Sequence, residues 1–222
     1  MIPWETLDEA PIPGGRETLR LKRRGTEISI MLGANELMNS RLSGSEEALA
    51  RLTIERIAAP APRILIGGLG LGFTLRAALP LLPPAARVTV AELVPGVVAW
   101  ARGHLAALHG DSLDDPRVTI LTDDVGAVMR GGPWDAILLD VDNGPEGLSR
   151  AGNDALYSHA GLAAARAALG PGGVLSVWSS APDRGFTRRL ADAGFRVETH
   201  TVRAGTTGRG ARHTIWLAAK PR

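Results

Sequence analysis

The sequence predicts an α/β fold, a doubly wound and mostly parallel sheet of seven strands with helices on both faces. Two observations carry this prediction. From residue 63 onward, short apolar runs that suit buried strands alternate with longer segments of helical periodicity. The last two predicted strands, 195–202 and 213–219, are joined by a glycine- and arginine-rich loop without a helical pattern, so we expect them to pair antiparallel.

The other predicted elements of this region follow one another without an internal repeat. Apolar runs predict strands at 64–66, 87–91, 118–121, 134–141 and 174–178. Helical periodicity predicts helices at 74–82, 95–108, 125–129, 156–169 and 186–193. The Gly-Pro-Gly-Gly segment at 170–173 is expected to form a sharp turn before the fifth strand.

The N-terminal residues are expected to form a small β extension. Residues 17–23 and 26–32 alternate apolar and polar side chains on either side of a glycine turn, which predicts a β-hairpin. Residues 35–39 are a candidate third strand, and residues 1–15 are interpreted as an irregular arm.

A helix is predicted to lead from this extension into the sheet. Ser43 and Glu46 have the spacing of a capping box, in which the serine caps the helix and the glutamate is its third residue. Prolines end this helix at about residue 60. We therefore expect two units, a β-hairpin extension with its helix at 1–60 and a nucleotide-binding unit at 61–222.

Composition excludes several classes of protein. Cysteine is absent from the 222 residues, which excludes disulfides, thiolate metal ligands and cysteine nucleophiles. Apolar residues make up 45% of the chain, enough for a sizeable core. No apolar run reaches the roughly 18 residues of a membrane span or resembles a signal segment, so we expect a cytoplasmic protein with no membrane partner.

Charge and aromatic content argue against a nucleic-acid partner. The formal net charge is +2, and the longest basic run is Lys22-Arg23-Arg24. Aromatic residues, at 4%, are too sparse to form a stacking platform among the basic ones. His104 and His109 share a predicted helix with no acid or thiol in a matching position, so we expect no metal site.

A nucleotide site is predicted where the first strand of the sheet meets the next helix. Gly68, Gly70 and Gly72 follow the apolar run at 64–66, and glycines at such a turn let a ligand approach bare backbone amides. The next strand ends in Glu92, roughly 20 residues further on. A nucleotide-binding βαβ unit carries at this place the carboxylate that accepts hydrogen bonds from the ribose hydroxyls.

Acidic residues also follow the third and fourth strands, at Asp123, Asp124 and Asp140. Ligands of an open parallel sheet bind beyond the carboxyl ends of its strands, so these side chains are expected to meet at one edge. One of Asp123 and Asp124 is expected to cap the helix that starts at Val125. The glycine turn, a ribose carboxylate and an acceptor for the adenine amine together predict an adenosine site.

Three segments resemble a known family. They are the glycine loop at 68–76, the Val-Ala-Glu-Leu-Val-Pro-Gly-Val-Val segment at 90–98, and Leu-Tyr-Ser at 156–158 with Leu-Gly-Pro-Gly-Gly-Val-Leu at 169–175. In these segments the chain resembles the class I S-adenosylmethionine-dependent methyltransferase fold, and within it the spermidine/spermine synthase-like group. The resemblance covers about residues 40–220.

The resemblance implies S-adenosylmethionine or its decarboxylated form as the cofactor. It implies that Glu92 binds the ribose, that Asp123 binds the adenine amine, and that the glycine loop lies near the methionine-derived tail. The cofactor-binding residues predicted in this way are Gly68, Gly70, Leu71, Gly72, Glu92, Leu93, Asp123, Asp124 and Asp140.

The chain departs from the group at two acidic motifs. Leu71 replaces the aspartate of the group's glycine loop. The group's Asp-Ser-Ser-Asp-Pro motif becomes Asp-Val-Asp-Asn-Gly-Pro at 140–145, with Asn143 in place of the second aspartate. Asn143 cannot act as a general base, so Asp142 is the candidate proton acceptor, with a solvated turn as the equal alternative. Asp140, Asp142 and Asn143 are the predicted catalytic residues.

Four residues are predicted to contact the substrate: Glu46, Asp142, Asn143 and Tyr157. Glu46 lies where the group has N-terminal substrate contacts, but the capping box also explains it without a ligand. Tyr157 is the one tyrosine of the chain, so the tyrosine-rich substrate pocket of the group is missing.

The loss of a negative charge at Leu71 favours a cofactor tail that bears a carboxylate. We therefore expect an enzyme, an S-adenosylmethionine-dependent methyltransferase acting on a small-molecule acceptor, which needs mainly proximity and alignment. One alternative is a polyamine aminopropyltransferase that uses decarboxylated S-adenosylmethionine. The other is a non-catalytic protein that binds the nucleoside and presents a surface to a partner. The exposed hairpin is compatible with a homodimer.

Overall fold

The structure, a computed structural model, describes residues 2–141, 145 and 155–222. The larger of its two sheets consists of β5 (Arg63–Gly67), β6 (Arg87–Glu92), β7 (Val118–Thr122), β8 (Trp134–Leu139), β9 (Leu169–Ser179), β10 (Arg196–Arg203) and β11 (Arg212–Ala219). Their order is β10-β11-β9-β8-β5-β6-β7. β5 to β9 pair in parallel, and β11 pairs antiparallel with both β9 and β10. The predicted seven-stranded sheet with its antiparallel end is confirmed.

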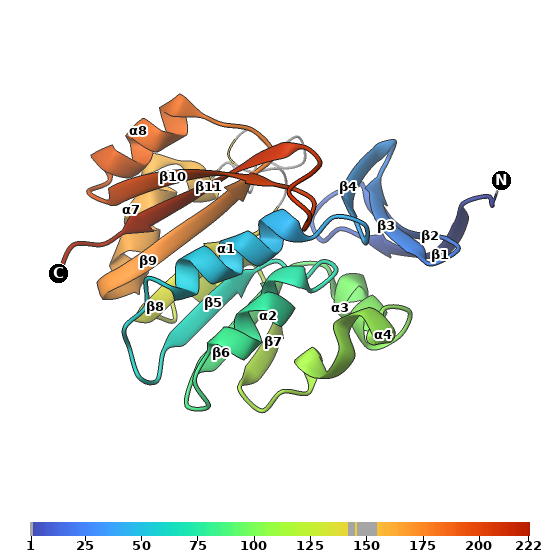
Figure 1. Ribbon diagram of the computed structural model, residues 1–222, viewed down its shortest axis with the longest axis horizontal. Helices are drawn as coiled ribbons and strands as arrows, with labels where there is room; N and C mark the ends of the chain where they lie inside the picture. Colours follow the sequence, from blue (N-terminus) through green and yellow to red (C-terminus); the bar gives the residue numbers. More distant parts are fainter. Residues whose placement is uncertain (1, 142–144, 146–154) are drawn as a thin grey trace.

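Helices cover both faces of this sheet (Figure 1). They are α1 (Gly44–Ile54), α2 (Phe73–Ala78), α3 (Pro95–Arg102), α4 (Ala106–His109), α5 (Val125–Met129), α7 (His159–Ala168), α8 (Arg184–Asp192) and the 3-10 helices η1 (Leu79–Leu81) and η2 (Gly110–Leu113). Neighbouring residues of β5 enter different cores: Ile64 and Ile66 join the core beneath α1 to α3, and Leu65 joins the core beneath α7 and α8. No helix of the described residues is both long and apolar enough to cross a bilayer.

The smaller sheet is antiparallel and contains β1 (Glu5–Pro11), β2 (Thr18–Arg24), β3 (Glu27–Leu32) and β4 (Asn35–Asn39) in that order. The N-terminal extension is therefore larger than the predicted hairpin, and the interpretation of 5–11 as an irregular arm is wrong. β1 is mostly exposed and lacks a clear alternation; its backbone pairs with β2, and its side chains contact α3. The Trp100 indole N–H donates to Asp8 at 2.8 Å, and Ala10 packs closely against Gly96.

The segment 170–173 differs from the expected turn. β9 already pairs with β8 at Leu169, opposite Trp134, and pairing resumes at Val174 opposite Ala136. The glycines and proline lie in a register irregularity inside one long strand, which lets the backbone bulge without losing its neighbour.

Candidate active site

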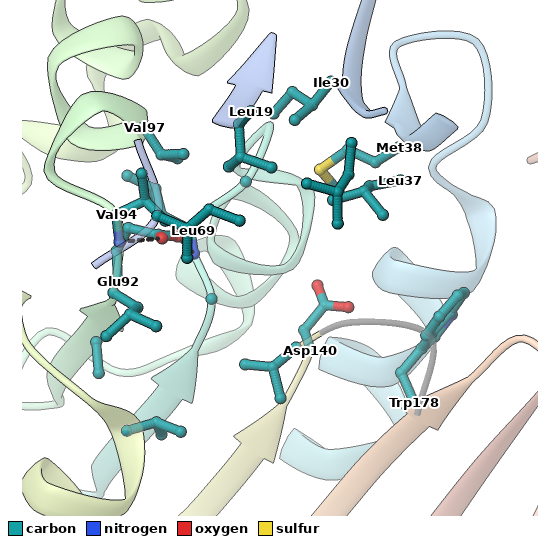
Figure 2. A pocket seen from close by; sticks show the side chains of 18 of the residues that line it. Leu19, Ile30, Leu37, Met38, Leu69, Glu92, Val94, Val97, Asp140 and Trp178 are labelled. Atoms are coloured by element: carbon teal, nitrogen blue, oxygen red, sulfur yellow. Dashed lines mark hydrogen bonds between the residues drawn. The ribbon is translucent and has the colours of Figure 1, made fainter. Parts of the chain in front are cut away.

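A cavity lies at the carboxyl ends of β5, β6 and β8, where an open parallel sheet binds its ligands (Figure 2). Its sheet side is formed by the turn after β5, by Glu92 at the end of β6 and by Asp140 after β8. The N-terminal sheet forms an apolar wall that faces the Asp140 carboxylate. The residues of this apolar wall are Ile12, Leu19, Ile30, Leu32, Leu37 and Met38.

The glycine turn is shaped by positive φ angles and by close neighbours. Gly68, Gly70 and Gly72 have φ values of +90°, +48° and +78°. A Cβ on Gly68 would overlap the backbone carbonyl oxygen of Asp140, and a Cβ on Gly72 would overlap the His109 ring. The glycines therefore permit both the turn and the close approach of β8 to it.

Gly68→Ala is expected to destabilise the fold by about 2–4 kcal/mol, because both the φ angle and the Asp140 carbonyl oppose a methyl group. Gly33→Ala is the matched control, since Gly33 also has a positive φ (+56°) but has no heavy atom near its added Cβ. Urea unfolding of the two variants separates the clash from the backbone strain. Equal losses in the two variants would show that the contact with Asp140 costs nothing.

Glu92 ties the second strand to the glycine turn. Its side chain is 8% exposed. The two carboxylate oxygens accept hydrogen bonds from the backbone N–H groups of Leu69 and Val94, each at 2.9 Å. Burial raises the pKa of Glu92, and the backbone N–H donors oppose this shift. An ionised carboxylate offers about four lone-pair directions, so it can still accept hydrogen bonds from ligand hydroxyls.

Two further carboxylates, those of Glu46 and Asp140, line the same cavity. Burial and, to a smaller extent, the negative charge of Asp140 raise the pKa of Glu46 to about 7. Burial likewise raises the pKa of Asp140 to about 6, while the hydroxyl of Thr74, which donates to it at 2.6 Å, opposes the shift. No ion pair reaches either carboxylate among the described residues. The pair therefore concentrates negative charge that no cation of the described chain balances.

The predicted capping box does not form, and this frees Glu46. Ser43 occupies the N-cap position of α1 but makes no side-chain capping bond, and its hydroxyl donates to Glu47 at 2.7 Å. Glu46 instead accepts from the Ser45 hydroxyl at 2.6 Å. The alternative in which the capping box accounts for Glu46 is therefore wrong.

The remaining predicted site residues fall into four groups, the last of which lies in the protein core. Leu93 and Asp124 line the cavity, and Asp124 also caps α5 by accepting from the Ala127 N–H at 3.1 Å, as predicted for one of the two aspartates. Asp123 is exposed at the end of β7 and accepts from the Asp124 N–H at 2.7 Å, so its adenine contact stays a prediction. Asp142 and Asn143 lie outside the described residues.

Leu71 and Tyr157 point into the protein core. Leu71 is fully buried among apolar side chains, although its backbone N–H donates to the Met38 sulfur at 3.2 Å. Tyr157 is 2% exposed and packs edge-on against Phe186, with 5.6 Å between the ring centroids. Neither side chain is part of the lining of the cavity.

Sequence reasoning missed the apolar wall and Trp178, which also lines the cavity from β9. The alternation in β2 and β3 indicates that one face of the hairpin is apolar. It cannot indicate what that face covers, because the partner, the glycine turn, is distant in sequence.

Solved structures share this architecture over nearly the whole chain. The spermidine synthase of Thermotoga maritima superposes with a TM-score of 0.76 at 21% identity, covering 97% of this chain and 72% of that one. The chain has the spermidine synthase fold. A spermidine synthase in complex with the transition-state analogue AdoDATO matches this fold equally well, with a TM-score of 0.75, 20% identity, and 97% and 72% coverage. The predicted class I methyltransferase-like fold of the spermidine synthase-like group is confirmed.

Curated relatives carry the same resemblance in sequence. The polyamine aminopropyltransferase of Mycobacterium tuberculosis (strain H37Rv) is 32% identical over 157 residues, which are 65% of this chain and 29% of that protein. Polyamine aminopropyltransferase 2 of Pseudomonas aeruginosa is 34% identical over 124 residues, or 53% and 33%. The chain thus spans a third or less of the length of these relatives. No family model matches it.

These relatives overturn the prediction of a methyltransferase, because they are aminopropyltransferases. The physical reason for the error lies at Leu71. That prediction assumed that the leucine removes a negative charge from beside the cofactor tail. Its side chain instead packs in the core, whereas Glu46 and Asp140 supply negative charge inside the cavity.

Proposed function

We propose that the chain is an aminopropyltransferase that uses decarboxylated S-adenosylmethionine and a polyamine acceptor. The observation that carries this proposal is a pair of carboxylates, the buried Glu46 and the half-buried Asp140, in the cavity that also contains the glycine turn and Glu92. Its relatives in sequence, which are polyamine aminopropyltransferases, support it.

The residues of the cavity fit the decarboxylated form better than the intact one. Two desolvated carboxylates attract ammonium groups strongly, because charges interact more strongly away from water. The decarboxylated tail ends in an ammonium group alone, and the polyamine acceptor is also cationic. Intact S-adenosylmethionine would bring a third carboxylate next to Glu46 and Asp140, which the same electrostatics disfavour.

Each part of the chain has a task in this reaction. Glu92 and the glycine turn hold the nucleoside, and the apolar wall excludes water from it. Decarboxylated S-adenosylmethionine, when bound, supplies an aminopropyl group attached to a sulfonium sulfur, and the rest of the molecule leaves as a neutral thioether when that C–S bond breaks. An acceptor amine must be neutral to attack, and it becomes an ammonium as the new N–C bond forms. Glu46 and Asp140 hold the acceptor, and with pKa values near neutrality they can take up the released proton.

Incubation of the chain with decarboxylated S-adenosylmethionine and a set of diamines and polyamines tests the proposal. We expect 5′-methylthioadenosine and an acceptor extended by one aminopropyl group, both detected by mass spectrometry. Intact S-adenosylmethionine is expected to bind at least about 10-fold more weakly in calorimetric titrations. Binding of the decarboxylated form without any product would refute aminopropyl transfer and favour a nucleoside-binding protein.

A further inference from the structure

A chain of hydrogen bonds leads from the cavity to the last strand of the sheet. The Ser45 hydroxyl donates to Oε2 of Glu46 at 2.6 Å. The same hydroxyl lies 2.9 Å from Nδ1 of His213, which is on β11. Ser45 is fully buried and His213 is half-buried, so water does not compete freely for these groups. Helix α1 and a strand some 168 residues away thus meet at one polar contact.

When Glu46 is ionised, the number of available protons determines which group donates in each of these hydrogen bonds. A carboxylate can only accept, so the one proton of the Ser45 hydroxyl is used on Glu46. The Ser45 oxygen must then accept from His213, which places a proton on Nδ1. Burial lowers the pKa of His213, so the ring donates as a neutral imidazole and adds no positive charge near Glu46.

The other charged groups around Glu46 disfavour its ionised form, so the hydrogen bond from Ser45 is needed to oppose them. Asp140, from the end of β8, and Glu47, from α1 itself, both face Glu46 with negative charge and raise its pKa. The Ser45 hydroxyl lowers it. Thr74 of α2 donates to Asp140 and not to Glu46. Among the described residues, Ser45 is the side chain that lowers the pKa of Glu46, and His213 contacts Ser45 on its other side.

The His213 ring is fixed by a second contact. It packs edge-on against the Trp178 indole, with 4.8 Å between the ring centroids and an interplanar angle of 77°. Trp178 is 8% exposed and lines the cavity. The indole therefore sets the orientation in which Nδ1 faces Ser45.

We propose that His213 and Ser45 are positioning residues that hold the Glu46 carboxylate ready to take a proton from the acceptor amine. The proposal rests on the proposed function for the identity of that amine. The hydrogen bonds themselves act on Glu46 whether or not an amine is bound. His213 does not touch the cavity and acts through Ser45.

Two variants of His213 separate the effect of its Nδ1–H donor from the effect of its ring contact with Trp178. His213→Asn places an amide N–H near the position of Nδ1 but loses the ring contact with Trp178. His213→Phe keeps a ring against Trp178 but has no donor. The titration of Glu46 is followed in each ligand-free protein by carbon-13 NMR of glutamate carboxyl groups, with Glu46→Gln used to assign the signal. The pH profile of kcat/KM is measured in parallel.

His213→Phe is expected to raise the pKa of Glu46, and with it the acidic limb of the pH profile, by about 0.5–1 unit, the effect of one lost hydrogen bond. His213→Asn is expected to leave both close to those of the natural chain. Ser45→Ala is expected to shift the pKa of Glu46 at least as far, and adding His213→Phe to it is expected to cause no further shift.

An unchanged Glu46 titration in His213→Phe would overturn the proposal. Equal shifts in the Phe and Asn variants would also overturn it, because the donor would then not be the cause. The NMR titration needs no turnover. If it shifts as expected while the natural chain makes no aminopropylated product, the proposed function fails and the support of Glu46 by His213 stands.

Discussion

Glu46→Gln is expected to lower kcat for aminopropyl transfer by about 100-fold or more and, at the same time, to stabilise the fold at pH 8. The first effect follows because an amide cannot take up the proton that the acceptor amine releases. The second follows because the native state holds a desolvated carboxylate whose pKa is raised to about 7 from an ordinary value of 4.5.

The sign of the stability effect is set by proton binding. Between pH 4.5 and 7 the folded chain binds more protons at Glu46 than the unfolded chain does, so the natural protein loses stability as the pH rises through this window. Above it, both states are ionised and the full penalty is present. We expect Glu46→Gln to gain about 2 kcal/mol in the free energy of unfolding at pH 8 and clearly less at pH 5, measured by urea denaturation.

Glu47→Gln is the matched control for this experiment. It makes the same chemical change on the next residue of α1, whose side chain is exposed and outside the cavity that contains Glu92. The charge of Glu47 is the smallest of the influences on the pKa of Glu46, so the stability and kcat of Glu47→Gln are expected to stay near those of the natural chain. A loss of stability in Glu46→Gln at pH 8 would contradict this prediction. It would show that a cationic partner stabilises the ionised Glu46 carboxylate in the folded chain, so that desolvation does not destabilise it.

Glu92→Gln is expected to weaken the binding of 5′-methylthioadenosine, the nucleoside product of the proposed reaction, by about 100-fold. A glutamine has one acceptor oxygen where Glu92 has two, and both oxygens of Glu92 already accept from the backbone at Leu69 and Val94. The amide NH₂ would face one of these N–H donors, and too few lone pairs would remain for the ribose hydroxyls. Calorimetric titration measures the loss.

A deoxynucleoside makes this prediction specific to the ribose. The natural chain is expected to bind the 2′-deoxy analogue more weakly than 5′-methylthioadenosine, and Glu92→Gln is expected to bind the two about equally, because the hydroxyl has lost its acceptor. Glu17→Gln, at an exposed position of the N-terminal segment, serves as the control. Full discrimination between the two nucleosides by Glu92→Gln would place the ribose elsewhere.

The apolar runs, the glycine spacing and Glu92 could be interpreted from the sequence because their causes are local. A buried parallel strand is apolar over its whole length, and a turn with positive φ needs glycine at Gly68, Gly70 and Gly72. A carboxylate at the end of the next strand must lie beside that turn, since the two strands are paired in register. These features depend on few residues that are close in the chain.

Most of the errors concern contacts between distant segments. The first strand, β1, pairs with β2 and contacts α3, and the wall of the cavity comes from a sheet that precedes the glycine turn by some 30 residues. The place of Leu71 in the glycine-loop motif predicts a side chain beside the cofactor tail, but that side chain packs in the core. The capping box is a local exception: Ser43 bonds to Glu47 instead, and Glu46, which is also a predicted substrate contact, lines the cavity.

The doubly wound sheet, the glycine turn and the carboxylate beside it follow from the amino-acid sequence, because periodicity and glycine spacing are properties of short segments. Which acids share the cavity depends on the tertiary fold. Glu46 from α1 and Asp140 from β8 meet there, and His213 from β11 reaches Glu46 through Ser45. Their charges and hydrogen bonds act through space, over separations in the chain that a sequence pattern does not record.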